Sequence, residues 1–322
     1  MNSGSFRSGG QPAVSFQPQW QRHVGAWRDL LAQCARRPGR KRVHALRSLT
    51  LRLRVAVECW LLDQVQDATA AGAFRRWKKE GKKLRRALEP VRDVDVYLAR
   101  LDGLRGILGE ASGGEPKLSP RCLREMDKLE IRLQQRRLVE IEKLMTIIDA
   151  RSKRLGRLSR EMELALAPRV PATARSTAPA ALRIFAGLAS ELPHLDSANL
   201  HAYRKRLKQA LYLAEISAAA DPLADELAAA FRKIHEVAGE WHDWQALALE
   251  TGRVLPGHGK QDGLVPVLET LAEGALERAL GLCKQCAERF LKKAGEIPPS
   301  QGRKPVASDP GYRSGAALRT PA

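Results

Sequence analysis

Two histidine-led segments of this chain carry arginine and glutamate at matching distances. In HALRSLTLRLRVAVE (44–58) an arginine follows the histidine after three residues and a glutamate after fourteen, and HAYRKRLKQALYLAE (201–215) repeats both distances. Imidazole and guanidinium groups on one helix face donate hydrogen bonds to phosphate oxygens, and the guanidinium adds positive charge. The repeat therefore predicts two related cationic faces directed at one anionic ligand.

The apolar residues of both segments fall on a different helix face from the basic ones. At about 100° per residue, Leu46, Leu53 and Val57 share one side of the first segment, while Tyr203 and Leu207 mark the apolar side of the second. The basic side chains of the two segments are His44, Arg47, Arg52, Arg54, His201, Arg204 and Lys208. Each segment is expected to bury its apolar side in a core and to leave its basic side available.

The similarity between the two segments continues downstream. Lys82 lies eleven residues before Asp93 in KKLRRALEPVRD, and Arg232 lies eleven residues before Asp243 in RKIHEVAGEWHD, where Lys233 matches a lysine of the first copy. The same order of elements in both places indicates a duplicated unit whose copies pack as a pseudo-symmetric pair. We expect the two aspartates to cap a helix or to orient a basic residue.

The segment FRRWKKEGKKLRRALEPVRD (74–93) is the most basic stretch of the chain. Its basic stripe, which falls within about 100° on a helical wheel, consists of Arg75, Lys78, Lys79, Lys82 and Arg86. Like charges at i,i+4 repel by a few tenths of a kcal/mol per pair, so the stripe suggests a partner that brings negative charge. A basic face that is merely solvated is the alternative.

The charge of the whole chain also points to a polyanion. Lys and Arg number 55 against 36 Asp and Glu, which gives a net charge of +19. Such an excess suits nucleic acid, an anionic membrane surface or another phosphate polymer, with general solubility as the alternative. Five cysteines without paired zinc-ligand spacing argue for a reducing compartment. No signal peptide and no run of about 18 apolar residues are seen, so we expect a cytoplasmic protein that does not cross the membrane.

The apolar spacing predicts an all-α fold, because a period near 3.6 recurs and no alternating strand pattern is found. The expected helices cover 18–36, 41–70, 72–88, 91–108, 119–164, 181–190, 196–218, 222–238, 240–254 and 263–294. Asp196 or Ser197 is expected to cap the helix that carries His201, and Pro222 to open the next one after Asp221.

Composition divides the chain into tails, a linker and two halves. Residues 1–17 and 296–322 are rich in Gly, Ser, Pro and charge and are expected to be disordered. The ordered part, 18–295, is expected to consist of a first half (18–165), a Pro-rich linker (166–180) and a second half (181–295).

This ordered set of motifs resembles the CHAD domain, the conserved-histidine α-helical domain, over about residues 18–295. Each half of that family carries an H-x-x-R helix, then a basic helix and a turn of the L-G-x-x-R-D or L-G-x-x-N-D kind, matched here by LEPVRD and AGEWHD. The resemblance implies two duplicated four-helix bundles around a basic central groove or pore. It also implies binding of inorganic polyphosphate and, in bacteria, association with polyphosphate granules.

The resemblance also implies the ligand-binding residues. Those carried over by position are His44, Arg47, Arg52, Arg54, Lys82, Arg92, His201, Arg204, Lys208 and Arg232, and the rest of the basic stripe with Lys233 completes the expected polyphosphate-binding set. Glu89 stands at a glycine position of the family and His242 at a common Asn position. Leu51 of the first helix, and Gln209 and Leu211 of the second, replace basic residues, which predicts weaker binding by the second half.

Other functions make different demands on the sequence. Metal-dependent phosphoryl chemistry needs clustered carboxylates or a phosphate-binding Gly-rich loop, and neither is found, so we expect no catalysis, metal or cofactor. Non-specific nucleic-acid binding is the alternative, although single-strand binders place aromatic rings beside their basic residues and here mainly Tyr212 does so. A scaffold that docks acidic proteins is a third possibility. The two histidines could contact ligand, or instead hold helices together by hydrogen bonds.

Overall fold

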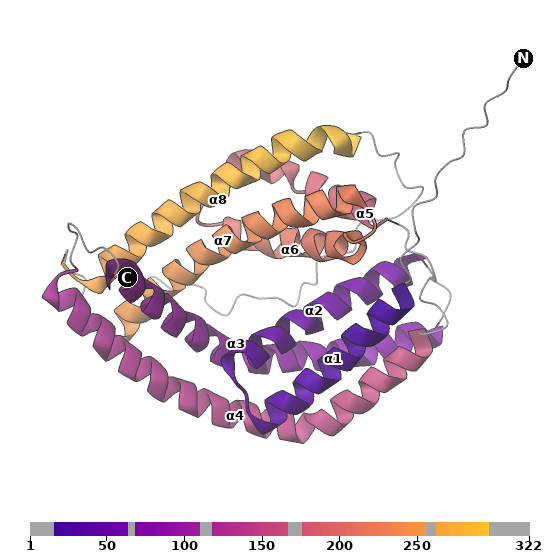
Figure 1. Cartoon of the computed structure of the whole chain (residues 1–322), viewed down its shortest axis with the longest axis horizontal. Coiled ribbons are helices and arrows are strands. Elements are labelled where there is room, and N and C mark those ends of the chain that lie inside the picture. The colour runs from indigo at the N-terminus through magenta and orange to yellow at the C-terminus, as the bar shows by residue number, and fades with distance from the viewer. Residues whose placement is uncertain (1–15, 64–67, 110–117, 167–175, 256–261, 296–322) are drawn as a thin grey trace, which may run out of the picture.

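The computed structural model describes residues 16–63, 68–109, 118–166, 176–255 and 262–295 (Figure 1). Its elements are α1 (Phe16–Arg36), α2 (Arg40–Asp63), α3 (Ala68–Gly109), α4 (Pro120–Leu166), α5 (Ala178–Ala186), the 3₁₀ helix η2 (Ala189–His194), α6 (Leu200–Ser217), α7 (Pro222–Val254) and α8 (Leu264–Gly295). The described residues contain no strand, so the all-α prediction is confirmed.

Two helices are longer than the sequence pattern predicts. α3 continues through Pro90 and α7 through Gly239, so the predicted breaks at 88–91 and 238–240 are wrong. A proline inside a helix removes one hydrogen bond and costs about 3 kcal/mol. Leu88, Val91 and Val94 are fully buried around Pro90. Burial on both sides of the proline therefore holds α3 together.

Of the helices α5, α6 and α7, only α7 begins at the residue predicted from the sequence. The Asp221 carboxylate accepts the Leu223 backbone N–H at 2.9 Å and Pro222 opens α7, as expected. α6 instead begins after Asn199, because Asp196 accepts the backbone N–H groups of Ala198 and Asn199 within the preceding turn. α5 begins three residues before the expected 181 and is followed by η2.

The predicted tails and linker lie mostly outside the described residues. Residues 1–15, 167–175 and 296–322 are not described, so the expected disorder of the tails and most of the expected linker stay predictions. Residues 16 and 17, assigned to the N-terminal tail, are already helical in α1. Residues 178–180, assigned to the linker, belong to α5.

The described residues form two hydrophobic cores. The first lies among α1, α2, the N-terminal part of α3 and the C-terminal part of α4, and contains Trp27, Trp77 and Leu155. The second lies among α5 to α8, but it also takes Val94–Leu104 of α3 and Cys122–Leu133 of α4. α3 and α4 therefore pass from one core into the other. Two bundles agree with the prediction, and their pseudo-symmetry stays a prediction.

Among the described residues, the main contacts between the two halves lie in two regions. The far ends of the α3–α4 and α7–α8 pairs meet at the left in Figure 1, and α2 contacts α6 near the middle. α2, α3, α6 and α7, which carry the basic motifs, are thus the helices that approach one another across the halves. None of the helices, within the described residues, has the length and apolarity to span a membrane.

A buried carboxylate ties α3 to α4 in the first half. Glu80 is 2% exposed, and it contacts Lys83 at 2.9 Å and Arg151 at 2.8 Å. The hydrogen bond from Lys83 holds its pKa below the ordinary value, against the effect of burial. Its stabilising contribution is therefore complete above the ordinary pKa of a glutamate and is lost as the pH falls through the lowered one.

We expect Glu80→Gln to lower the free energy of unfolding by about 2 kcal/mol at pH 7, because it removes the charge of a buried carboxylate that pairs with Lys83 and Arg151. Urea denaturation followed by circular dichroism measures this. Glu161→Gln is the matched control, because Glu161 also links α3 to α4 through Arg76 but at the surface, and should change stability by less than about 0.5 kcal/mol. Equal effects of the two substitutions would contradict the assigned role of Glu80.

Candidate functional site

Basic side chains from four helices gather between the two halves. We call them the central cluster: His44 and Arg47 of α2, Arg85 and Arg92 of α3, His201, Arg204 and Lys208 of α6, and His235 and His242 of α7. Burial and then the charges of Arg204, Arg47, Arg92 and Arg85 lower the pKa of Lys208 to about 7. This strong mutual effect shows that cations from both halves lie close together.

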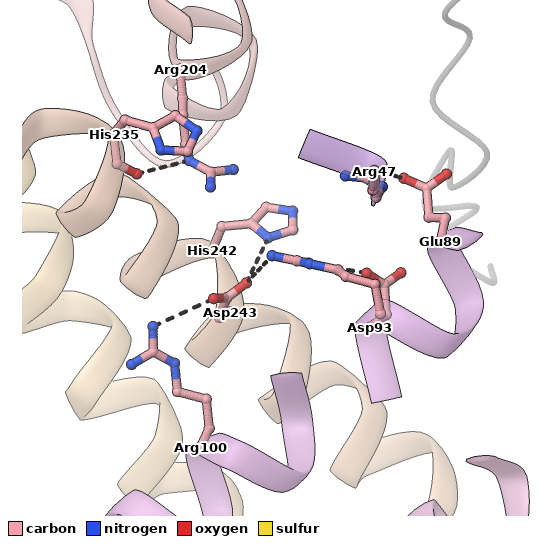
Figure 2. A network of polar contacts seen from close by, with 9 residues as sticks. Arg47, Glu89, Asp93, Arg100, Arg204, His235, His242 and Asp243 are labelled. Carbon is pink, nitrogen blue, oxygen red and sulfur yellow. Dashed lines mark hydrogen bonds and ion pairs between the residues drawn. The ribbon is translucent and has the colours of Figure 1, made fainter. Parts of the chain in front are cut away.

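Asp243 is the carboxylate around which the cluster is built. Its oxygens accept hydrogen bonds from Arg92 Nη2 and Arg100 Nη2, both at 3.4 Å, and lie 3.7 Å from His242 Nδ1 (Figure 2). Burial would raise the pKa of Asp243, but the contact with His242 and the charges of the arginines hold it below its ordinary value. Asp243 therefore stays ionised and joins α3 to α7.

Arg92 receives a second carboxylate from its own helix. Its Nη1 donates to Asp93 Oδ1 at 3.0 Å while its Nη2 reaches Asp243 on α7. The expectation that Asp93 and Asp243 orient a basic residue is thus confirmed, and both orient the same one.

Arg204 lies against a glycine and has no carboxylate of its own. Its Nε donates to the backbone oxygen of His235 at 3.2 Å, and a Cβ at Gly239 would come within 2.8 Å of Arg204 Nη2. Burial lowers the pKa of Arg204 to about 10. Within the described residues neither Arg204 nor Lys208 forms an ion pair, so both remain available to an anion.

Arg47, the counterpart of Arg204 in the first half, is already paired. Its Nη2 donates to Glu89 Oε1 at 2.6 Å. Its Nε is buried and meets no acceptor among the described residues. Figure 2 shows this pair and Arg204 on different sides of His242.

Burial favours the neutral form of three histidines of the cluster, His44, His201 and His235. The rings of His201 and His242 stack with centroids 4.3 Å apart. Burial, with neighbouring cations, lowers the pKa of His201 to about 3 and that of His235 to about 2, and lowers the pKa of His44. His201 Nδ1 and His235 Nε2 are buried without a hydrogen-bond partner in the described part of the chain, so each nitrogen, when it carries a proton, could donate a hydrogen bond to an oxygen of a bound anion.

Four other predicted residues form two groups around glutamates. Arg52 Nε and Arg232 Nη2 share Glu215 at 3.0 and 3.1 Å, which ties α2 to α6 and α7. Arg54 and Lys78 share Glu58 at 3.3 and 2.7 Å. These cations contribute to the basic surface, but their charge is partly balanced.

The remaining predicted residues are not part of the central cluster. Arg75, Lys79, Arg86 and Lys233 are exposed, and Lys82 is half-buried. The side chains of α3 that interact with α6 or α7 of the other half include Arg85, Glu89 and Arg92, none of which belongs to the predicted basic stripe. The predicted stripe lies further round the helix, because the inward side of α3 depends on where α6 packs, which helical periodicity does not specify.

The sequence analysis does not predict that Arg85, His235 and His242 belong to the central cluster. A signal was present in the repeat, because the offset of 150 residues that matches Lys82 with Arg232 also matches Arg85 with His235, and Arg92 with His242. Extending the comparison of the two copies along α3 and α7 would have found them.

A cavity of about 390 Å³ adjoins the cluster at the start of α2. It is lined by Arg40, Lys41, His44, Arg92, Asp95 and Val96. Arg40 and Lys41 were not predicted, and they extend the basic surface beyond the cluster. An anion at His44 and Arg92 could therefore continue into this cavity.

Comparisons with known proteins support the assignment of the fold. The family model described as CHAD domain matches residues 18–252. A crystal structure of the CHAD domain from the plant Ricinus communis aligns with a TM-score of 0.56 and 15% identity, covering 89% of this chain and 98% of that one. PptA from Streptomyces chartreusis aligns with a TM-score of 0.52 and 16% identity, covering 86% and 100%. A search of curated proteins finds no match.

The position of Lys208 predicts an unusual stability effect. We expect Lys208→Met to raise the melting temperature of the free protein at pH 6–7, because it removes a cation that its neighbours repel, and each kcal/mol gained adds about 2–4 °C. A lysine whose pKa is lowered in the folded state destabilises it most below that pKa. The gain should therefore shrink as the pH rises from 7 towards 10.

Lys233→Met is the matched control, because Lys233 is an exposed lysine of α7. Its melting temperature should stay within about 1 °C of the wild type. A lower melting temperature for Lys208→Met at pH 6–7 would show that the charge of Lys208 is already balanced in the free protein.

Proposed function

This chain belongs to the CHAD domain family, and on that basis we propose that it binds inorganic polyphosphate through the central cluster without cleaving it. The observation that carries the proposal is the pair formed by Arg204 and Lys208. Both lie among arginines of the two halves and neither has a carboxylate partner among the described residues. The charge of Asp243 acts on Arg204 without a direct ion pair between them, so an anion that contacts Arg204 and Lys208 directly would still gain from both cations.

The proposed ligand matches the cluster in charge and in chemistry. Polyphosphate presents roughly one negative charge per phosphate and only oxygen acceptors, so recognition depends on charge density and on donors. Arginine offers a planar fork for two oxygens and lysine a compact charge. Helices packed on two cores hold these donors in place before binding, which reduces the ordering cost.

The proposal of a non-catalytic role rests on the state of the carboxylates. Glu89 is held by Arg47, and Asp93 and Asp243 by Arg92. Carboxylates whose charge is already balanced by guanidiniums are poor ligands for Mg²⁺. In the described residues, no three His, Cys, Asp or Glu side chains are placed to hold a metal ion.

Nucleic acid fits the cluster less well than polyphosphate does. The one aromatic ring predicted on a basic face, Tyr212, is 5% exposed. Arg52 and Lys208 lie over its ring at 5.0 and 5.5 Å from the centroid. Trp241 and Trp244 of α7 are buried as well. Bases would therefore lack a stacking surface here, although a phosphate backbone could still bind.

In a cell, this binding would place the protein at polyphosphate granules. A granule presents many phosphate chains at its surface, so even a moderate affinity for each chain would be strengthened by rebinding. We therefore propose granule association in the cytoplasm as the cellular form of the same activity.

The first test removes the two unpaired cations. The wild type should bind long-chain polyphosphate with a submicromolar Kd that weakens steeply with salt, and Arg204→Gln combined with Lys208→Gln should weaken binding by about 100-fold or more. Fluorescence anisotropy with labelled polyphosphate measures both. Tagged wild type should form foci in cells that make polyphosphate, and the double variant should not.

Arg154→Gln combined with Arg157→Gln is the matched control. It removes the same charge from exposed residues of α4 and should lower affinity by less than about threefold. Equal losses in the two double variants would mean that net charge, and not the central cluster, determines binding.

The second test separates polyphosphate from nucleic acid. At fixed ionic strength, polyphosphate should displace a bound polyphosphate probe at a concentration about tenfold or more below that of single-stranded RNA, counted per phosphate, because no aromatic surface holds the bases. Equal displacement per phosphate would remove the case for polyphosphate over nucleic acid.

A further inference from the structure

The two halves treat equivalent arginines differently. Arg47 and Arg204 occupy the same place in the repeat, three residues after His44 and His201. The offset of 150 residues that aligns α3 with α7 places Glu89 opposite Gly239. Arg204 packs directly over Gly239, while Arg47 forms a 2.6 Å ion pair with Glu89.

We propose that Glu89 is an internal competitor of the ligand, so that polyphosphate must displace its carboxylate before it can bind Arg47. This inference rests on the proposed function and adds a determinant of affinity to the same site. It also reverses the order of strength expected from the sequence. The second half, with Arg204 and Lys208 unpaired, provides the stronger contacts, and the first half binds only in exchange for Glu89.

The geometry allows such an exchange. The side chains of Arg47 and Glu89 are 26% and 37% exposed, so a ligand can reach the pair without opening a core. A carboxylate and a phosphate present similar oxygen pairs to a guanidinium, so one can replace the other. Displaced Glu89 can turn to solvent or stay near Lys205. Burial lowers the pKa of Lys205, and the charge of Glu89 already offsets part of that effect.

The exchange makes the contribution of Arg47 small. One charge-assisted pair is broken for each one formed, so the net gain from this arginine is close to zero, while an unpaired arginine would contribute in full. The exchange also has an electrostatic signature. When a phosphate of the ligand binds Arg47 in the wild type, few counterions are released in total, because Glu89 already balances the charge of Arg47. A phosphate that binds an unpaired arginine releases about one counterion.

Glu89→Gln tests the proposal, because it keeps the size of the side chain and removes its charge. We expect this variant to bind long-chain polyphosphate about tenfold more tightly than the wild type at low salt. The slope of log Kd against log salt should steepen by about one unit. A purely structural role in joining α2 to α3 would lower stability without steepening the slope, so both are measured, with melting temperature as the check on folding.

Two comparison variants isolate the effect. Asp102→Asn removes the same charge from an exposed position of α3 and should change affinity by less than about twofold. In Arg47→Gln the further change Glu89→Gln should have little effect, because the competitor acts only through Arg47, and this double-mutant cycle measures the coupling directly.

The outcomes separate the two proposals. If the wild type binds polyphosphate and Glu89→Gln binds it with equal or lower affinity, Glu89 is not a competitor and the proposed function stands. A gain of the same size in the Arg47→Gln background would also overturn the role of Glu89, because the effect would then be general charge. If neither the wild type nor Glu89→Gln binds polyphosphate, the proposed function itself is wrong.

Discussion

The structure depends on holding mutually repelling cations together between two helical halves. Arg47, Arg92 and Arg204 are close enough to lower the pKa of Lys208, and such an arrangement opposes folding in the absence of an anion. Burial of apolar side chains in the two cores must outweigh this repulsion. The stability of the cores is therefore what makes a preformed anion site possible. A bound anion would restore part of the free energy of unfolding that the repulsion removes.

Carboxylates are distributed so that they fix the frame of the site and leave its centre positive. Asp243 joins α3 to α7 through Arg92, and Glu215 joins α2 to α6 and α7 through Arg52 and Arg232. The ion pairs between the halves thus position the cluster while the counter-charge for its centre is left to a ligand.

Much of the site could be predicted from the repeat. The contacts between residues on different helices could not. The His-x-x-Arg spacing predicted that His44, Arg47, His201 and Arg204 belong together, because helical period and duplication are properties of the sequence itself. Arg85 and His235 were missed because the inward side of α3 depends on where α6 packs. Local propensity predicts a helix end at Pro90, whereas the burial of Leu88 and Val91 on both sides of it keeps α3 continuous. The Arg47–Glu89 pair joins residues on separate helices, which spacing alone cannot place.

The passage of α3 and α4 through both cores determines how the chain can be divided. A fragment that ended at Leu166 would leave Val94, Leu101 and Met126 facing water, since their partners lie on α5 to α8. The Pro-rich linker is therefore no boundary between autonomous folding units, whatever its composition suggests. The two halves should therefore unfold in a single cooperative transition. Expressed as separate fragments, they would expose apolar surface and be insoluble.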